Sequence, residues 1–164
     1  MSLFTNENLI IPLCALATDV NPNAELDSFS MKGYGHATVI IQFAASLTGD
    51  NVLTVECGAT DSADTLDATF HYRLGSAAPG SATADTLAAD ATAATLTLTA
   101  ATYQGKMLVL EIDADELPTS GTTVYDWVTV DFDGTASVGT IMAFAILSNP
   151  RFAGAIMPSA IPAT

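Results

Sequence analysis

Residues 36–57 read HATVIIQFAASLTGDNVLTVEC, and most of this stretch alternates apolar with polar side chains. Alternation with a period of two is typical of a β-strand that buries one face. Ile40 is the exception, because it is apolar on the otherwise polar face. The cluster TGDN at residues 48–51 has the composition of a chain reversal, so the sequence predicts two antiparallel strands joined as a β-hairpin.

The same alternation recurs in short segments separated by Gly, Pro, Asp and Asn, and it predicts further strands near residues 9–11, 68–74, 95–99, 108–112 and 124–132. Residues 141–147 are apolar on both faces, which indicates a central or an interface strand. The Ala-rich stretch 85–94 could form a helical turn or two. Since no amphipathic crossover helices occur, we expect an all-β, antiparallel, jelly-roll-like β-sandwich with extended N- and C-terminal segments.

A chain of 164 residues fits one domain with one core. We divide it into an N-terminal arm or first strand at residues 1–16, a β-sandwich domain at 17–150 and an extended C-terminal tail at 151–164. Pro158 and Pro162 exclude an ordinary helix in the tail. Both ends hold more apolar side chains than free tails should, so we predict that they contact other subunits through Leu9, Ile10, Ile11, Phe152, Ile156, Met157 and Ile161.

The charge is strongly acidic, with 4 Lys and Arg against 18 Asp and Glu and a formal net charge of −14. The basic residues are scattered singly, which argues against nucleic acid as a partner. No run approaches the ~20 apolar residues of a membrane span, so no membrane partner is expected. The start, MSLFTNENL, lacks the features of a signal peptide, and we expect synthesis in a cytoplasm.

Catalytic chemistry has little support in the sequence. His36 and His71 are the only imidazole bases, and both lie on the polar faces of predicted strands, where a solvent-facing histidine is the ordinary case. Cys14 and Cys57 lack CxxC spacing, and Cys57 alternates with apolar neighbours as a small core residue does. No GxSxG elbow, phosphate loop or zinc spacing occurs. We therefore expect no catalytic residues, no cofactor and no enzyme.

Calcium is the more serious alternative, because several loops carry clustered oxygen donors. None of these clusters has EF-hand spacing, so no metal site is predicted, but the question stays open for the acidic groups Asp61, Asp64 and Asp67, Asp113, Asp115 and Glu116, and Asp131 and Asp133.

Three stretches together resemble small structural proteins of tailed bacteriophages, namely VNPNAELDSFSMKGYGHATVIIQF at 20–43, KMLVLEIDADEL at 106–117 and FAILSNPRFAGAIMPSAI at 144–161. This resemblance implies a virion component, most plausibly a capsid decoration or cement protein that binds the outer surface of the phage head and stabilises it. The implied partners are the major capsid protein and further copies of the chain. A homotrimer is preferred by analogy, because cement proteins commonly sit at three-fold positions of a shell. The implied location is the capsid surface of the virion, after synthesis in the host cytoplasm.

Other classes of protein share parts of this pattern. A host-binding or carbohydrate-binding β-sandwich module should show an exposed cluster of aromatic side chains, whereas Trp127 is the only tryptophan. A surface-layer or pilus subunit needs an export signal, and a major capsid protein generally needs a longer chain. Which face contacts the capsid is left open by the sequence.

Overall fold

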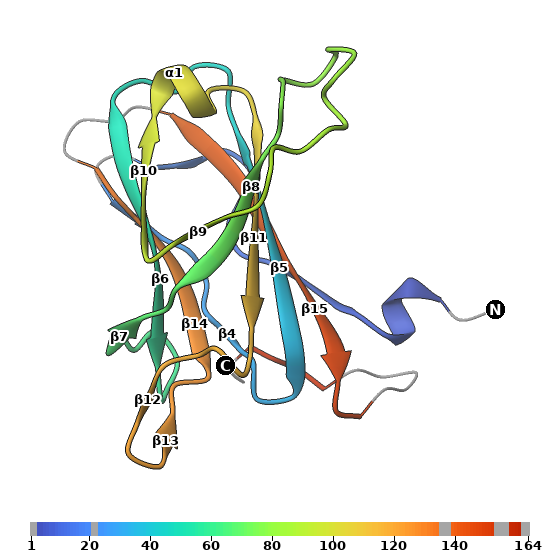
Figure 1. The fold of residues 1–164 in the computed structure, drawn as a ribbon, viewed down its shortest axis with the longest axis vertical. Helices are drawn as coiled ribbons and strands as arrows, with labels where there is room; N and C mark the ends of the chain where they lie inside the picture. Colours follow the sequence, from blue (N-terminus) through green and yellow to red (C-terminus); the bar gives the residue numbers. More distant parts are fainter. Residues whose placement is uncertain (1–2, 21–22, 135–138, 153–157, 162–164) are drawn as a thin grey trace.

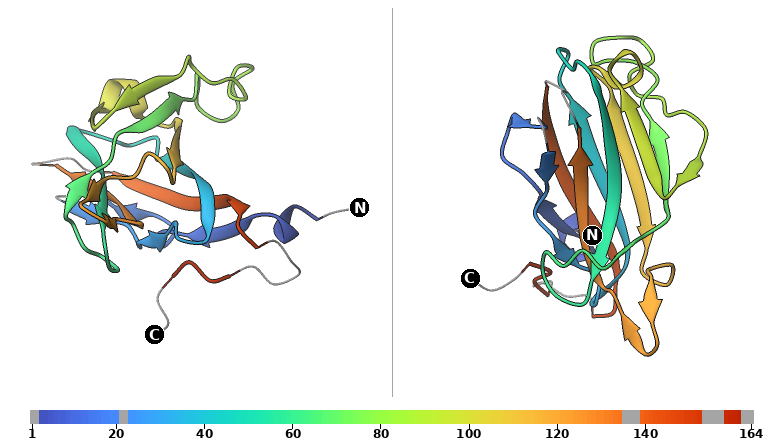
Figure 2. Two further views of the ribbon diagram at one scale, coloured as in Figure 1. Left: turned by 60° about the horizontal axis from the view of Figure 1, so that its bottom comes forward. Right: turned by 90° about the vertical axis from the view of Figure 1, so that its left-hand side faces the viewer.

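The computed structural model describes the chain except for residues 1–2, 21–22, 135–138, 153–157 and 162–164. Two antiparallel sheets pack against each other (Figures 1 and 2). The first sheet consists, in spatial order, of β1 (Leu9–Pro12), β15 (Thr140–Pro150), β5 (Tyr34–Phe43), β11 (Met107–Asp113), β8 (Phe70–Leu74) and β9 (Ala91–Ala93), with β2 (Thr18–Asp19) also on β15. The second has the order β10 (Thr95–Thr99), β6 (Asp50–Gly58), β14 (Trp127–Asp133) and β3 (Asn23–Glu25), with β4 (Phe29–Ser30) on β14 and β7 (Leu66–Asp67) on β6.

The strand pairing is nested, with the first strand of the chain against the last. β1 pairs with β15, β3 with β14, β5 with β11 and β6 with β10, and every pair is antiparallel. Numbered in chain order, these eight strands run 1-8-3-6 in one sheet and 2-7-4-5 in the other. That is the strand order of a jelly roll, and it confirms the predicted all-β, jelly-roll-like sandwich.

The predicted β-hairpin at residues 36–57 is wrong. Its two strands exist as β5 and β6, but they lie in different sheets and pair with β11, β15, β10 and β14 instead of with each other. The connection at residues 44–49 crosses from one sheet to the other. Leu47 is buried in this connection, so its apolar side chain fills the end of the core and does not extend the strand.

The core lies between the sheets and is built from the alternating apolar residues. Ala37, Val39 and Ile41 of β5 face Leu53 and Val55 of β6 across it, as the alternation predicts. Cys57 also belongs to the core; burial is the largest cause of the rise of its pKa to about 12, and the nearby carboxylates of Asp67 and Glu56 add to it. Cys14 and Cys57 are both free thiols.

Among the described residues, helix is confined to two short pieces. The 3₁₀ helix η1 (Phe4–Asn6) stands out beside the sandwich, and α1 (Ala100–Tyr103) caps the opposite end between β10 and β11 (Figure 1). The helical turn considered for residues 85–94 is absent, since part of this stretch pairs with β8 as the edge strand β9. The strand predicted at residues 124–132 begins later, at Trp127 of β14. Val124 lies instead in the small hairpin of β12 (Thr119–Ser120) and β13 (Thr123–Val124).

Candidate functional site

The outer face of the first sheet is unusually apolar. Along β5 and β15 the buried residues alternate with side chains that point away from the core, and many of these outward residues are apolar. None of them belongs to the core cluster or packs against it. We call this surface the docking face; its apolar residues are Ile10, Ile40, Met107, Val109, Met142, Phe144 and Ile146. Val109 is buried, at 6% exposed, whereas the other six are partly exposed or exposed.

Strand register aligns the docking face into rows that run across the sheet. Phe144 lies opposite Ile40, and Ile40 lies opposite Val109 on its other side. In the next row Ile146 has Ile10 as its neighbour on β1. The side chains of such cross-strand neighbours contact each other, so the rows form one continuous patch.

The patch is large enough to be a contact surface. Each outward position covers about 4.8 Å by ~6.8 Å of the sheet, so the seven apolar positions give a projected area of about 230 Å². The polar side chains of Thr38, Gln42 and Glu111 occupy outward positions beside them. Exposed apolar patches of a few hundred Å² are often functional. Ile10 is 48% exposed and Met142 39% exposed, so water reaches the patch in the isolated chain.

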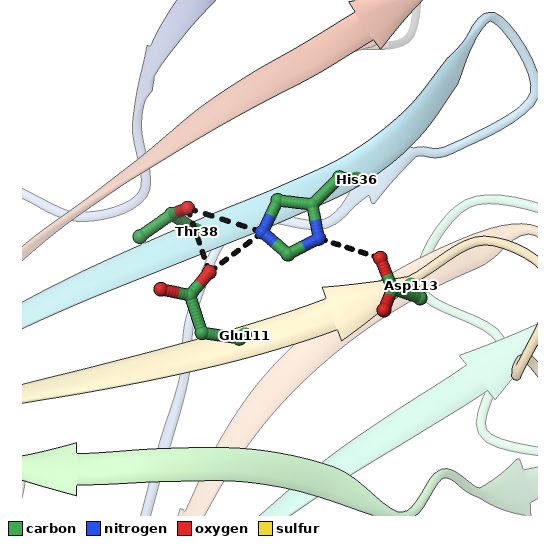
Figure 3. Close-up of polar contacts among 4 residues, drawn as sticks. All are labelled: His36, Thr38, Glu111 and Asp113. Carbon is green, nitrogen blue, oxygen red and sulfur yellow. Dashed lines mark hydrogen bonds and ion pairs between the residues drawn. The ribbon is translucent and has the colours of Figure 1, made fainter. Parts of the chain in front are cut away.

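Figure 3 shows a polar cluster of His36, Thr38, Glu111 and Asp113. This cluster borders the apolar rows, because Thr38 lies opposite Ile146 in the register. His36 of β5 lies between two carboxylates of β11, with its Nε2 2.6 Å from Glu111 and its Nδ1 2.6 Å from Asp113. Thr38 donates a hydrogen bond of 2.8 Å to the same oxygen of Glu111. Because a carboxylate oxygen accepts and does not donate, both ring nitrogens must donate here, and only the imidazolium can do so.

The pKa of His36 follows this geometry. Burial lowers the pKa, but the hydrogen bonds to Asp113 and Glu111 and the charges of these groups outweigh burial, and the net pKa is raised. His71 of β8, opposite Glu111 in the register, is bonded to Asp90 at 2.9 Å, and this bond raises its pKa. When protonated, each histidine balances the negative charge of a carboxylate on the outer face of the first sheet.

The two outer faces of the sandwich differ in charge. On and beside the first sheet, three bases (His36, His71 and Arg73) stand against four acids (Asp19, Asp90, Glu111 and Asp113), so the face has one more acid than bases and is close to neutral when both histidines are protonated. The strands of the second sheet contain no Lys, Arg or His. Their outer face, called the acidic face below, carries Glu25, Glu56, Asp67, Asp131 and Asp133.

Known proteins add little to this geometry. No family model matches the chain, and no curated protein matches it significantly. Among solved structures, a chain in "Structure of infectious bursal disease virus Gt strain" is similar at 13% identity and a TM-score of 0.24. The alignment covers 92% of this chain but 44% of that one. A TM-score this low does not define a shared fold, so the jelly-roll assignment rests on the strand order alone.

Glu56 is the most perturbed carboxyl of the acidic face. Burial first, and then the charges of Asp64, Asp131, Asp67 and Glu25, raise its pKa to about 7. Burial and the charge of Glu25 also raise the pKa of Asp131. At neutral pH this face therefore holds mutually repelling carboxylates, and it takes up protons readily.

This repulsion predicts how stability depends on pH. A carboxyl whose pKa is raised in the folded protein stabilises it while protonated, so the contribution is lost as the pH rises from about 4.5 to about 7. We expect Glu56→Gln to increase the free energy of unfolding at pH 8 by about 1 kcal/mol, after allowance for solvent screening, and to change it little at pH 4.5. Urea denaturation at the two pH values measures this. An equal effect of the substitution at both would contradict the assignment.

Two cavities lie near the ends of β1 and β14. One, of about 470 Å³, is lined by Trp127, Lys32, Arg151, Phe152 and Ile161 among others. The other, of about 530 Å³, is lined by Ile11, Asp61, Ser28 and again Ile161. In the second cavity the hydroxyl of Ser28 donates a hydrogen bond to the carboxylate of Asp61. Asp61 is one of the acidic residues that the sequence offered as possible calcium ligands.

The described part of the chain contains no group of three or more His, Cys, Asp or Glu arranged to hold a metal ion. It also contains no helix long and apolar enough to cross a membrane.

The predicted interface residues lie in three different environments. Ile11 is buried in the core, and Leu9 packs against the core. Ile10 points outward and joins the docking face. Phe152, 78% exposed, and Ile161, 49% exposed, line the cavity beside Trp127. Ile156 and Met157 lie outside the described residues.

Part of the tail packs on its own chain. The Tyr34 hydroxyl donates to the carbonyl of Pro158, and the backbone N–H of Ser30 donates to the carbonyl of Ala160, which is buried. Residues 158–161 therefore follow the surface of the sandwich beside β4 and the start of β5.

Most of the docking face was missed by sequence reasoning, although two signals marked it. Ile40 broke the alternation of its strand, and residues 141–147 were apolar on both faces. Both point to a sheet whose outer surface is also covered. The two segments form one apolar surface only because β5 pairs with β15, and this pairing cannot be predicted from either segment alone.

Proposed function

We propose that this chain is a structural protein of a tailed-bacteriophage virion, of the capsid decoration or cement type, that binds the outer surface of the head and stabilises it. The observation that carries the proposal is the docking face, an apolar outer sheet surface on a chain of net charge −14. Exposed apolar patches often mark sites of contact with another molecule, and an assembly subunit needs such a site. The phage resemblance of residues 20–43, 106–117 and 144–161 supplies the kind of assembly.

The jelly-roll fold supports a mechanical role of this kind. Jelly rolls occur in viral capsid domains and in lectins, so the fold is compatible with the proposal without selecting it. The exposed side chains of Phe152 and Ile161 at one end of the sandwich are our candidates for the contact with the major capsid protein.

Heads prepared without the chain provide the test. We expect added protein to be retained on them through sedimentation and to raise the temperature at which they rupture. The double variant Phe152→Ser/Ile161→Ser should bind about tenfold more weakly, because two exposed apolar contacts are lost. The matched control Leu66→Ser/Val124→Ser removes two other exposed apolar side chains and should bind normally. Failure of the unaltered chain to be retained would sink the proposal.

A host-binding or carbohydrate-binding module is the second candidate, and the cavity beside Trp127 favours it specifically. Lys32 and Arg151 line that cavity together with the indole, a combination suited to an acidic saccharide. Quenching of the Trp127 fluorescence by such a saccharide, with no retention on heads, would favour this candidate.

A further inference from the structure

We infer that the docking face is where copies of this chain join one another, sheet surface against sheet surface. The inference deepens the proposed function by naming the partner of the docking face, and it takes from that function only the premise that the chain is an assembly subunit.

Charge selects a second copy as the occupant. A chain of net charge −14 repels its copies through most of its surface, and the acidic face is the worst place for two copies to meet. The docking face is the exception, since all but one of its acids are offset by His36, His71 and Arg73. Two copies joined there keep their acidic faces apart and turned outward. A basic partner would be drawn to the acidic face instead, where its charge is complemented.

The apolar rows supply the attraction. Phe144, Ile40 and Val109 form the central row, and Ile10, Ile146, Met142 and Met107 extend it on both sides. The apolar centre with a polar, charge-paired rim at His36 matches the usual anatomy of a subunit interface. Its apolar part, about 230 Å² in projection, is smaller than the ~800 Å² per partner of a stable interface, so the polar residues around it must supply the rest of the contact.

A hollow beside the rows offers a place for interdigitation. It has a volume of about 270 Å³ and is lined by Leu16, Gln42 and Met142 among others. Leu16 is 81% exposed at its edge. A side chain from a neighbouring copy can enter this hollow while the rows pack against their counterparts, which gives the contact shape as well as apolar area.

This interface differs from the one predicted from the sequence, in which the two terminal segments contact other subunits. Of those candidate residues, only Ile10 lies on the docking face, while Phe152 and Ile161 lie at the cavity beside Trp127. The docking face thus joins copies, and the exposed side chains of Phe152 and Ile161 remain available to contact the head.

The test compares two double variants that add the same charge to opposite faces. Ile40→Glu/Phe144→Glu places two carboxylates in the central row, on cross-strand neighbours. Val52→Glu/Thr97→Glu places two on cross-strand neighbours of the second sheet, also pointing outward. Sedimentation equilibrium then measures the mass of each protein against the monomer mass of 16.9 kDa.

We expect the unaltered chain and the Val52→Glu/Thr97→Glu control to be oligomers, and Ile40→Glu/Phe144→Glu to associate at least about a hundredfold more weakly. Circular dichroism confirms that each variant is folded. If the glutamates prevent folding, Ile40→Thr/Phe144→Thr keeps strand-forming residues at both positions and should still weaken association at least about tenfold. A monomeric unaltered chain overturns the inference, and so does an oligomer that survives the docking-face substitutions.

Retention on heads separates this inference from the proposed function. A docking-face variant that stays oligomeric but leaves the heads shows that this face binds the capsid, which overturns the inference and keeps the function. An oligomer that depends on the docking face and never binds heads keeps the inference and sinks the function.

Discussion

Replacing Phe132 by alanine should cost about 3–5 kcal/mol of the free energy of unfolding. Phe132 of β14 has no exposed surface, and its ring meets that of Phe43 of β5 edge to face at 6.5 Å. The pair joins the two sheets inside the core, so alanine leaves a cavity that neither sheet can close alone. A domain of this size is stable by only ~5–15 kcal/mol, and urea denaturation should show a large fall in the midpoint.

Phe152→Ala is the matched control, because it removes the same atoms from a side chain that is 78% exposed. We expect it to change the free energy of unfolding by less than ~0.5 kcal/mol. Similar losses at both positions would show that Phe132 does not occupy the inter-sheet core.

Adding one methyl group at Gly58 should cost about 2–3 kcal/mol. A Cβ there would lie 2.1 Å from the carbonyl oxygen of Ala63 and 2.4 Å from the Cβ of Ala63. The obstacle is backbone, so the loop after β6 must move and strain the hydrogen bond of 3.0 Å from the Thr65 N–H to the Cys57 carbonyl. Thermal melting of Gly58→Ala should show the loss.

Gly33→Ala serves as the comparison, since a Cβ at Gly33 meets no atom within 4 Å. Alanine restricts the unfolded chain more than glycine does, so this variant should be unchanged or more stable by up to ~1 kcal/mol. If Gly58→Ala melts at the same temperature as Gly33→Ala, the close approach of the loop is not present in solution.

The strands were predictable because one side of each segment is buried. In β5, β8 and β11 the alternation identified the inward residues correctly, since Val39, Phe70 and Leu110 all lie in the core. Alternation is a local property that follows directly from the two-residue repeat of a strand. The alternation can therefore be recognised without knowing which strands pair with the segment.

Pairing was not predictable in the same way. The reversal TGDN after Leu47 has the composition of a hairpin turn, yet it connects strands of opposite sheets. A turn residue reports only that the chain bends, while the pairing is decided by which apolar surfaces close the core together. The nested order of the jelly roll pairs segments far apart in sequence, beyond the reach of local rules.

The candidate site was foreseen in part. Ile10 was named from the apolar content of the N-terminal segment, and His36 was expected on a polar face, where it lies. Its two carboxylate partners on β11 come from residues more than seventy positions away, and no spacing rule connects them. The neutral character of the docking face depends on these partners, so it became visible only with the register known.

The nested pairing also has a consequence for synthesis on the ribosome. Leu9 pairs with Leu147, a separation of 147 − 9 = 138 residues, so the first strand is made long before its partner. At roughly 5–20 residues per second, β1 waits on the order of ten seconds for its partner, and Ile11 stays uncovered during that time. The first sheet therefore closes only after β15 has emerged from the ribosome. Copies can join through this sheet only once β15 is in place.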